Sequence, residues 1–453
     1  MDQPHDQPDP APDQAAGAMR PPPAADPGSA AAPPRRPRPR RPTELPLYYL
    51  LVALYFFTFG MHIVLYPSLV TFTLGAGPEF VGIAQVTMSA PMFVFLMFGG
   101  TLAGRARAGP TLALLQAAFA IVMALLAWAV WRGALTYPLL ITYGALIGTG
   151  AAFMLPVRDS ALNGVVERDA ACGRATSLGR AAATTAAVQI GAQIIGIVVA
   201  RTAGAHPAPY LLIQAGVMSL GALLSFALKA PKPESFGPRT LLSAFTDIRE
   251  GLVYAFKSPI MGPMIWSAAY IGVFVIGSFQ VLFPLIVREA YGGDAAAQAA
   301  RLSELFACFW GASFVSAAIL SRLPPLEYPG AALTLSHLAL AATLYSLSLE
   351  QPFWSCALFV LLGGLAGGVA ISASRSLTQS AAEPRYLGRV LAAYSMGFMG
   401  GAPIGSAMVG VAAGEFGARH AALVPALGLA LAVLALIFFS PIWKLRPSEH
   451  GLY

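Results

Sequence analysis

Residues 59–70 read FGMHIVLYPSLV, and residues 276–287 read IGSFQVLFPLIV. A glycine, a Val-Leu-aromatic-Pro run and a final valine recur between them at an offset of about 217 residues. The same offset pairs three further residues with identical ones, namely Arg105 with Arg322, Gly150 with Gly367, and Arg158 with Arg375. The chain is therefore predicted to contain two related halves.

The composition excludes an ordinary soluble protein. Hydrophobic residues make up 57% of the chain, charged residues make up 11%, and the mean hydropathy is +0.66, whereas soluble domains carry roughly 25% charged residues. Two related halves of a membrane chain favour a transporter whose site lies between them. The cysteines Cys172, Cys308 and Cys356 are far apart, and they predict neither a metal site nor a disulfide.

Apolar runs of about 20 residues predict an all-α integral membrane fold, with twelve transmembrane helices in two pseudo-symmetric bundles of six. The expected bundles cover residues 46–228 and 259–441, with a linker over 229–258 and a tail over 442–453. The twelve runs occupy residues 46–72, 81–104, 110–131, 135–157, 177–200, 208–228, 259–288, 302–321, 329–349, 353–375, 388–413 and 418–440.

Residues 1–45 are rich in proline and poor in large apolar side chains, so we expect a disordered cytoplasmic tail. No secretory signal is visible in it. The sequence RRPRPRR, from Arg35 to Arg41, shortly precedes the first span. Clustered arginines here either bind anionic lipids of the cytoplasmic leaflet or act only as a topology signal, and the sequence leaves both readings open.

The basic residues are sorted between the loops as expected when both termini are cytoplasmic. All but five of the 28 Lys and Arg fall on the inner side of the twelve-span arrangement. The net charge of +7 follows from this sorting and does not require a nucleic-acid partner. The five outer residues are Arg132, Arg201, Arg288, Arg301 and Arg419.

The linker over residues 229–258 has the pattern of an amphipathic helix. Its apolar residues from Leu241 to Phe256 share one helical face, and charged residues such as Arg249 and Glu250 take the other. We expect this helix to lie along the cytoplasmic surface. A plain connector between the two bundles is compatible with the same pattern.

Four short motifs carry a family resemblance. They are residues 148–158 (GTGAAFMLPVR), 173–178 (GRATSL), 247–252 (DIREGL) and 386–390 (YLGRV). With them the chain resembles the major facilitator superfamily over about residues 46–445, and more narrowly the enterobactin-exporter-like bacterial effluxers, also called transmembrane secretion effectors. The resemblance implies a monomer in the bacterial inner (plasma) membrane that needs no cofactor.

The family's signature between spans two and three, roughly Gly-x-x-x-Asp-Arg-x-Gly-Arg, is only partly present. Residues 100–107 read GTLAGRAR, so Gly104 replaces the acid, Arg107 replaces the second glycine, and Arg105 remains. In the family this loop resembles a latch between conformations. The loss of the acid argues against an ion-paired latch in this chain.

His62 is the main candidate for proton coupling. An ionisable group at the centre of a bilayer costs roughly 2.5–3.5 kcal/mol by insertion scales and is functional by default. His62 shares a helix face with Tyr55, Phe59 and Tyr66, and histidine titrates near neutral pH. Family members often carry an acid near this place, where this chain has Met61 and His62. A histidine that only hydrogen-bonds to a neighbouring helix, and a facilitator driven by the substrate gradient, remain open.

In this superfamily, spans one, four, seven and ten line the central cavity. The resemblance therefore implies a cavity with aromatic, uncharged walls, which suits a bulky apolar or amphipathic ligand. Lipid-facing or packing roles are the alternative for each aromatic residue. The candidate lining residues are Tyr55, Phe59, His62, Tyr66, Tyr143, Trp266, Tyr270, Gln280 and Ser372.

Arg158 and Arg375 are predicted at the cytoplasmic ends of spans four and ten, where a guanidinium can reach the interface or cap carbonyls. Asp159 is expected to pair with a basic residue of the inner loops. With Arg105 and Arg322, these residues are interpreted as gating or structural groups. The glycines of the span over 388–413 predict close helix packing.

The sequence thus predicts a secondary active transporter that exports a bulky amphipathic or apolar small molecule by alternating access, with or without proton coupling. A lipid or lysolipid flippase and a transport-inactive sensor on the same fold are alternatives. An integral-membrane enzyme is disfavoured, because it would need clustered carboxylates or a base–nucleophile set, and the acids beyond the tail are scattered. No metal is predicted.

Overall fold

A computed structural model describes residues 43–103, 106–172, 177–204, 206–229, 246, 249–250, 253–258, 260–324, 326–381, 383 and 386–444. The chain divides into two units, Met1–Pro42 and Thr43–Tyr453, and the fold described here is that of the second. The expectations for the tail, for Arg105, for most of the linker and for residues 445–453 lie outside the described residues.

Every regular element in the described ranges is a helix. The elements of the first half are α1 Leu45–Ser68, η1 Leu69–Thr73, α2 Pro78–Ala103, α3 Ala108–Trp131, α4 Tyr137–Ala171, α5 Leu178–Ala200 and α6 Pro207–Ser225. Those of the second half are α8 Met261–Ile271, η2 Gly272–Gly277, α9 Ser278–Ile286, η3 Val287–Tyr291, α10 Ala295–Leu320, α11 Pro329–Ser346, α12 Phe353–Ala381, α13 Leu387–Ala421, α14 Leu423–Phe439 and η4 Pro441–Lys444.

The two halves repeat one packing pattern. In the first half α2 packs on α4 and α3 packs on α6, and in the second half α10 packs on α12 and α11 packs on α14. The first and last residues of α10 lie about 217 residues after the first and last residues of α2, which is the offset of the sequence repeat. The predicted two-fold organisation is therefore confirmed in the packing.

Glycines set how closely the helices of each half approach. Gly60 of α1 lies against the backbone of Gln193 in α5, and Gly405 of α13 lies against the backbone of Val273 in η2. A Cβ atom at either glycine would collide with that backbone. Close backbone contact drives helix association in lipid, so the close packing predicted for the glycines of α13 is confirmed.

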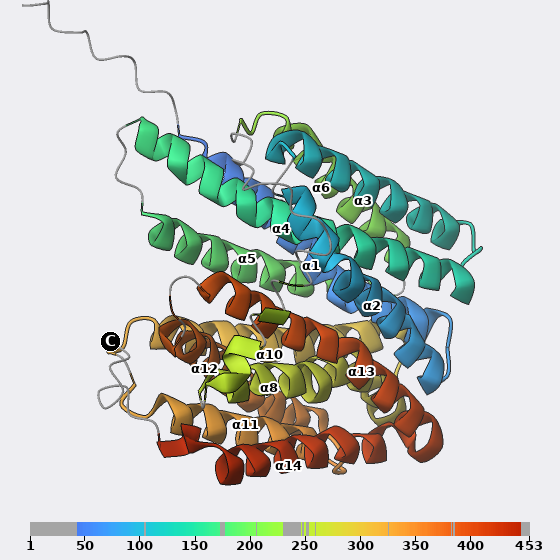
Figure 1. Cartoon of the computed structure of the whole chain (residues 1–453). Coiled ribbons are helices and arrows are strands. Elements are labelled where there is room, and N and C mark those ends of the chain that lie inside the picture. The colour runs from blue at the N-terminus through green and yellow to red at the C-terminus, as the bar shows by residue number, and fades with distance from the viewer. Residues whose placement is uncertain are drawn as a thin grey trace, which may run out of the picture. The chain divides into compact units, whose positions relative to one another are not determined.

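The two halves meet through two equivalent helix pairs, α2 with α13 and α5 with α10 (Figure 1). Gly82 of α2 and Gly410 of α13 approach each other backbone to backbone. Ser303 of α10 donates a hydrogen bond of 2.6 Å to the carbonyl oxygen of Ile197 in α5.

The helices run between two ends of the protein, which we name by a residue at each. The Arg288 end is the one that contains η1 and η3, and the Thr43 end is the one where α1 begins.

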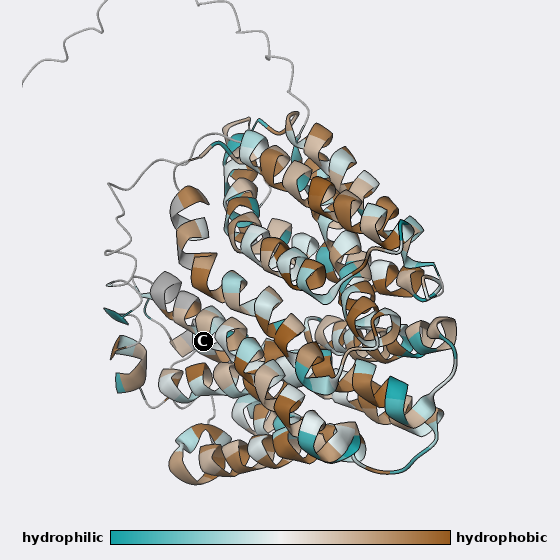
Figure 2. Cartoon of the chain, turned by 90° about the vertical axis from the view of Figure 1, so that its right-hand side faces the viewer, coloured by the Kyte–Doolittle hydropathy of each residue, from teal (hydrophilic) through white to brown (hydrophobic). Residues whose placement is uncertain are grey.

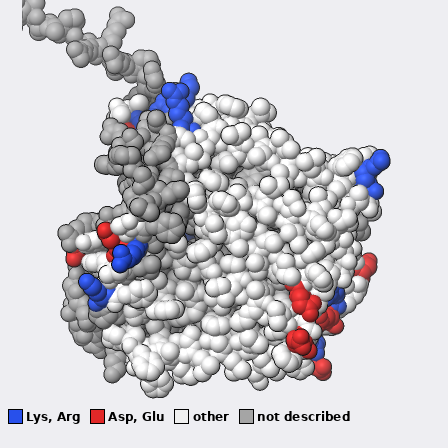
Figure 3. Space-filling model, turned by 45° about the vertical axis from the view of Figure 1, so that its right-hand side comes forward, with Lys and Arg blue, Asp and Glu red and all other residues white. Residues whose placement is uncertain are grey.

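The protein is a multi-pass membrane protein. Ten helices of the described chain are long and apolar enough to cross a membrane, and the shorter α14 is apolar too. Hydrophobic residues run along the helices in Figure 2, and in Figure 3 charged side chains gather at the margins of a broad uncharged face. α11, which contains Thr334, Ser336 and His337, is not among the ten.

We expect Gly60→Ala to lower the free energy of unfolding by about 1–3 kcal/mol, because the new methyl group overpacks the α1–α5 contact. Gly191→Ala in α5 is the matched control, since nothing lies within 4 Å of a Cβ atom built there. Thermal unfolding of the purified protein in detergent measures both. Equal effects of the two substitutions would contradict the packing account.

Candidate functional site

His62 lies in the interior of the first half, between α1, α2 and α4. Its Nδ1 is 3.2 Å from the hydroxyl of Tyr143, and its Nε2 is 3.1 Å from Sδ of Met88. Its ring stacks on that of Tyr66, with centroids 5.3 Å apart. The structure therefore brings together three of the candidate residues, and it adds Met88, which the sequence analysis did not select.

Tyr66 fixes the face of α1 that carries His62. Its hydroxyl donates to the carbonyl oxygen of Ala84 at 3.0 Å and lies 3.3 Å from that of Leu140. Gly144 of α4 leaves room for the ring. These contacts tie α1 to α2 and α4, so the histidine is held in a small polar cluster inside an apolar bundle.

Arg158 of α4 is buried nearer the Thr43 end. Its guanidinium lies 5.0 Å from the ring centroid of Phe56, a cation–π arrangement. Its Nη2 and Nε donate to Oδ1 of Asp159 at 2.7 and 3.0 Å. In the part of the chain that the structure describes, Asp159 thus pairs with its own neighbour instead of the expected basic residue of the inner loops, because Arg158 is within reach on the same helix. The Nη1 atom of Arg158 is buried without a hydrogen-bond partner in the described part of the chain.

The second half contains a histidine–tyrosine pair as well. The hydroxyl of Tyr270 in α8 is 3.3 Å from Nδ1 of His337 in α11, and the two rings meet edge to face. Trp266, one turn before Tyr270, is 62% exposed and lies beside the ring of Phe256. Tyr270 and Trp266 therefore occupy different surroundings.

Two of the remaining candidates, Tyr55 and Phe59, lie beside Phe56, the ring that Arg158 contacts. Tyr55 is buried against the rings of Phe56 and Phe119. Phe59 is half-buried beside Phe56. Gln280 and Ser372 are half-buried, and Arg322 and Arg375 are exposed.

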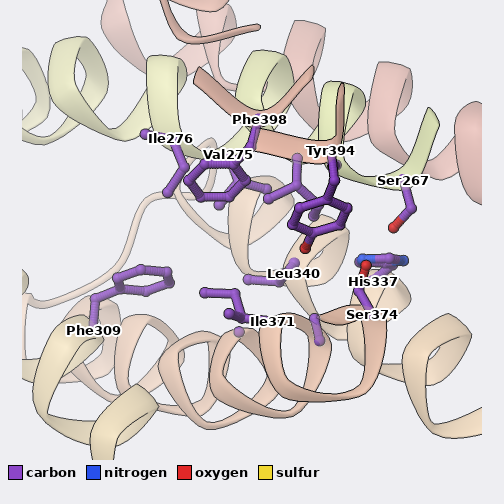
Figure 4. Close-up of a pocket in the computed structure, with 14 residues that line it drawn as sticks. Ser267, Val275, Ile276, Phe309, His337, Leu340, Ile371, Ser374, Tyr394 and Phe398 are labelled. Atoms are coloured by element: carbon purple, nitrogen blue, oxygen red, sulfur yellow. The ribbon is translucent and has the colours of Figure 1, made fainter. Parts of the chain in front are cut away.

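A pocket of about 20 Å³ lies within the second half, lined by 14 residues. Figure 4 shows the polar ends of His337 and Ser374 near one end and the ring of Phe309 at the other. The sequence analysis did not select this pocket. Its α12 lining, from Gly367 through Ile371 to Ser374, has the spacing of a single helix face, which could have indicated it.

The comparisons with known proteins agree with this geometry. A family model described as Major Facilitator Superfamily matches residues 48–406. The chain belongs to this superfamily. Superfamily members are transporters and not enzymes, as the sequence predicted. No curated protein sequence matches the chain.

Solved structures of superfamily transporters share the fold at low sequence identity. The nucleoside transporter NupG has a TM-score of 0.68 at 13% identity, over 89% of this chain and 99% of that chain. An inward-facing, occupied bacterial homologue of the human lysosomal transporter Spinster has a TM-score of 0.65 at 13% identity, over 86% and 94%. The peptide transporter POT with sulfate has a TM-score of 0.65 at 15% identity, over 90% and 97%.

We expect Tyr143→Phe to destabilise the protein by about 1–3 kcal/mol, because Nδ1 of His62 would then lie buried without its partner. Tyr55→Phe is the matched control, since that ring is buried in the same half and away from His62. Thermal unfolding in detergent checks the difference. A Tyr143→Phe variant as stable as the control would show that the His62–Tyr143 bond contributes nothing.

Proposed function

We propose that this superfamily transporter exports a bulky amphipathic or apolar small molecule by alternating access, in keeping with its resemblance to the enterobactin-exporter-like group. In the proposed topology, the Thr43 end faces the cytoplasm of a bacterium and the Arg288 end faces outward. The observation that carries the proposal is the position of the bonds that join the two halves.

Among the described residues, the side-chain bonds in question lie at the Arg288 end. Nη1 of Arg288 donates to the carbonyl oxygens of Ala76 at 2.6 Å and Thr71 at 3.4 Å, across the junction of the halves. Arg201 pairs with Glu304 at 2.7 Å, also across that junction. An exposed pair contributes little by itself, but a half-buried arginine bonded to two carbonyls is a specific contact. This arrangement supports a conformation that is closed at the Arg288 end.

Charged groups at the Thr43 end are suited to holding that end closed in the alternate conformation of the transporter. The side chain of Asp159 is 65% exposed although it binds Arg158, and Arg375, at the equivalent place of the second half, is exposed. Two arginines at equivalent positions would repel each other as this end closed. A carboxylate between them would offset that repulsion, so Asp159 is the natural bridge to Arg375 in the alternate state.

The surroundings of the candidate residues support an apolar or amphipathic substrate. His62 contacts a thioether and two tyrosine rings. Among the candidate residues that the structure describes, Arg158 has the one buried guanidinium, and it already has an anionic partner. Aromatic walls with a few polar groups bind such molecules and orient them.

A lipid flippase is a second candidate function. It is favoured by a groove of about 730 Å³ between α3 and α6. Small residues such as Ala117 and Gly216 line this groove, together with the exposed Leu114 and Leu223.

Flux of a panel of amphipathic dyes from proteoliposomes, with and without a pH gradient, tests the function. If His62 couples transport to protons, His62→Ala abolishes the response to the gradient, whereas the exposed His420→Ala variant keeps it. Equal responses of wild type and His62→Ala would remove His62 from coupling. Scrambling of a fluorescent phospholipid in the same vesicles without dye flux would favour the flippase, and no flux of either kind would overturn transport.

We expect Arg288→Gln to shift the population towards a state in which the Arg288 end is open. Arg419→Gln is the matched control, because Arg419 lies at the same end but pairs with Glu350 within its own half. Distances between spin labels on the two halves, measured by pulsed electron resonance, report the change. The labelled background replaces Cys172, Cys308 and Cys356 and carries Arg132→Cys and Leu349→Cys. An unchanged distance distribution in Arg288→Gln would contradict the proposal that Arg288 holds this end closed.

A further inference from the structure

The groove of about 730 Å³ lies between α3 and α6, which pack side by side in the first half (Figure 1). Buried alanines form its floor, among them Ala113 of α3 and Ala222 of α6. The larger side chains of Ile121 and Leu212 line it as well and are exposed. Small residues in the floor and branched ones along the edges give the groove its depth.

The groove is long enough to follow an acyl chain through one leaflet. Its α3 lining runs from Pro110 to Ala124, which is about 21 Å of helix at 1.5 Å per residue. Its α6 lining runs from Leu212 to Phe226. One leaflet supplies roughly half of a hydrocarbon core of about 30 Å. A chain that enters at one membrane surface can therefore stay in the groove down to the middle of the bilayer.

The lining of the groove is almost entirely apolar. None of its 14 residues is charged. Ser219 is the one with a polar side chain, and it donates its hydroxyl proton to the carbonyl oxygen of Ala215 at 2.9 Å. A charged group in the groove would lose its water without gaining a partner of opposite charge. The part of a ligand that fills the groove is therefore hydrocarbon.

Two cations flank the Thr43 end of the groove. The start of α3 and the end of α6 meet there, because a Cβ atom at Gly109 would collide with the carbonyl oxygen of Leu228. Arg107 directly precedes α3, and Lys229 directly follows Leu228. Each lies within one turn of the groove lining, and both are exposed.

Both cations are available to a ligand. Neither side chain is hydrogen-bonded or ion-paired within the described part of the chain. The carboxylate of Glu44 accepts a hydrogen bond from the backbone amide of Lys229 at 3.0 Å, but it is already paired with Arg168 at 3.0 Å. The described residues at this end of the groove thus have an excess of positive charge.

This charge distinguishes between two possible occupants. Small residues on a lipid-facing surface also suit a helix of a second copy of the chain. A copy related by a two-fold axis along the membrane normal would bring its own Arg107 and Lys229 to the same level of the membrane, where like charges repel. An anionic phospholipid places a negative headgroup at these cations and an acyl chain in the groove.

We propose that the α3–α6 groove binds an acyl chain of an anionic phospholipid from the leaflet at the Thr43 end, and that Arg107 and Lys229 hold its headgroup. The site is independent of the transport function proposed above, because it lies on the outer side of the first half and needs no change of conformation.

Lipid titrations of the full-length protein, followed by native mass spectrometry from detergent micelles, test the charge requirement. The probes are phosphatidylglycerol and phosphatidylcholine with the same acyl chains. We expect wild type to bind the first phosphatidylglycerol about 10–30-fold more tightly than the first phosphatidylcholine, since each cation contributes about 5-fold near a membrane surface. The double variant Arg107→Gln/Lys229→Gln should lower this ratio at least about 5-fold. Arg322→Gln, at an exposed position of the second half, is the matched control and should keep the ratio.

Gly216→Leu tests the groove itself. Nothing lies within 4 Å of a Cβ atom built at Gly216, so the new side chain fills the groove without displacing its neighbours. This variant should lose the tight phosphatidylglycerol site and keep the thermal unfolding midpoint of wild type. Gly311→Leu in α10, where a Cβ atom also meets open space, is the matched control and should leave lipid binding unchanged.

Three results would overturn the lipid site. The first is equal binding of the two lipids by wild type. The second is a phosphatidylglycerol preference that survives unchanged in Gly216→Leu or in the double variant, since the lipid would then bind elsewhere on the chain. The third is a lipid-free dimer that Gly216→Leu dissociates, which would assign the groove to a second copy.

Discussion

Close contact between helix backbones is the constraint on which this structure depends. Lipid tails are as apolar as the side chains that face them, so apolar helices gain little free energy by burying that surface against one another. Van der Waals contact therefore decides which helices associate. Gly60 in α1 and Gly405 in α13 supply that contact in the two halves, and Gly82 and Gly410 supply it between them. The positions of His62, Arg158 and the pocket follow from this framework.

Polar groups inside the framework have few partners, and the structure uses most of them locally. Hydroxyls bond to carbonyls of their own helix, as in Thr334 and Thr378, and such bonds add nothing between helices. Other side-chain bonds join helices, such as those of Tyr66 and of the two histidine–tyrosine pairs. Each of them constrains a helix position that apolar packing alone would leave adjustable.

The sequence was sufficient to predict the repeat, the helical membrane fold and the close packing of glycines, because each of these leaves a periodic or compositional trace. It predicted that His62 and Tyr66 share a face, since spacing on one helix fixes a face. It did not predict Met88 as a neighbour of His62, because contacts between helices depend on rotation and register that spacing does not encode. Asp159 was assigned a distant partner although its neighbour Arg158 was nearer.

The contact between Thr71 and Arg288 has a further consequence. The two residues occupy equivalent places in the duplicated sequence, so their contact lies beside the pseudo-two-fold axis. The acceptor is the backbone carbonyl oxygen of Thr71, which any residue at that place would supply, whereas the donor is the side chain of Arg288. The duplicated sequence has a threonine at the place equivalent to Arg288, so only one copy of the repeat supplies the donor and the two halves contribute unequally to this contact.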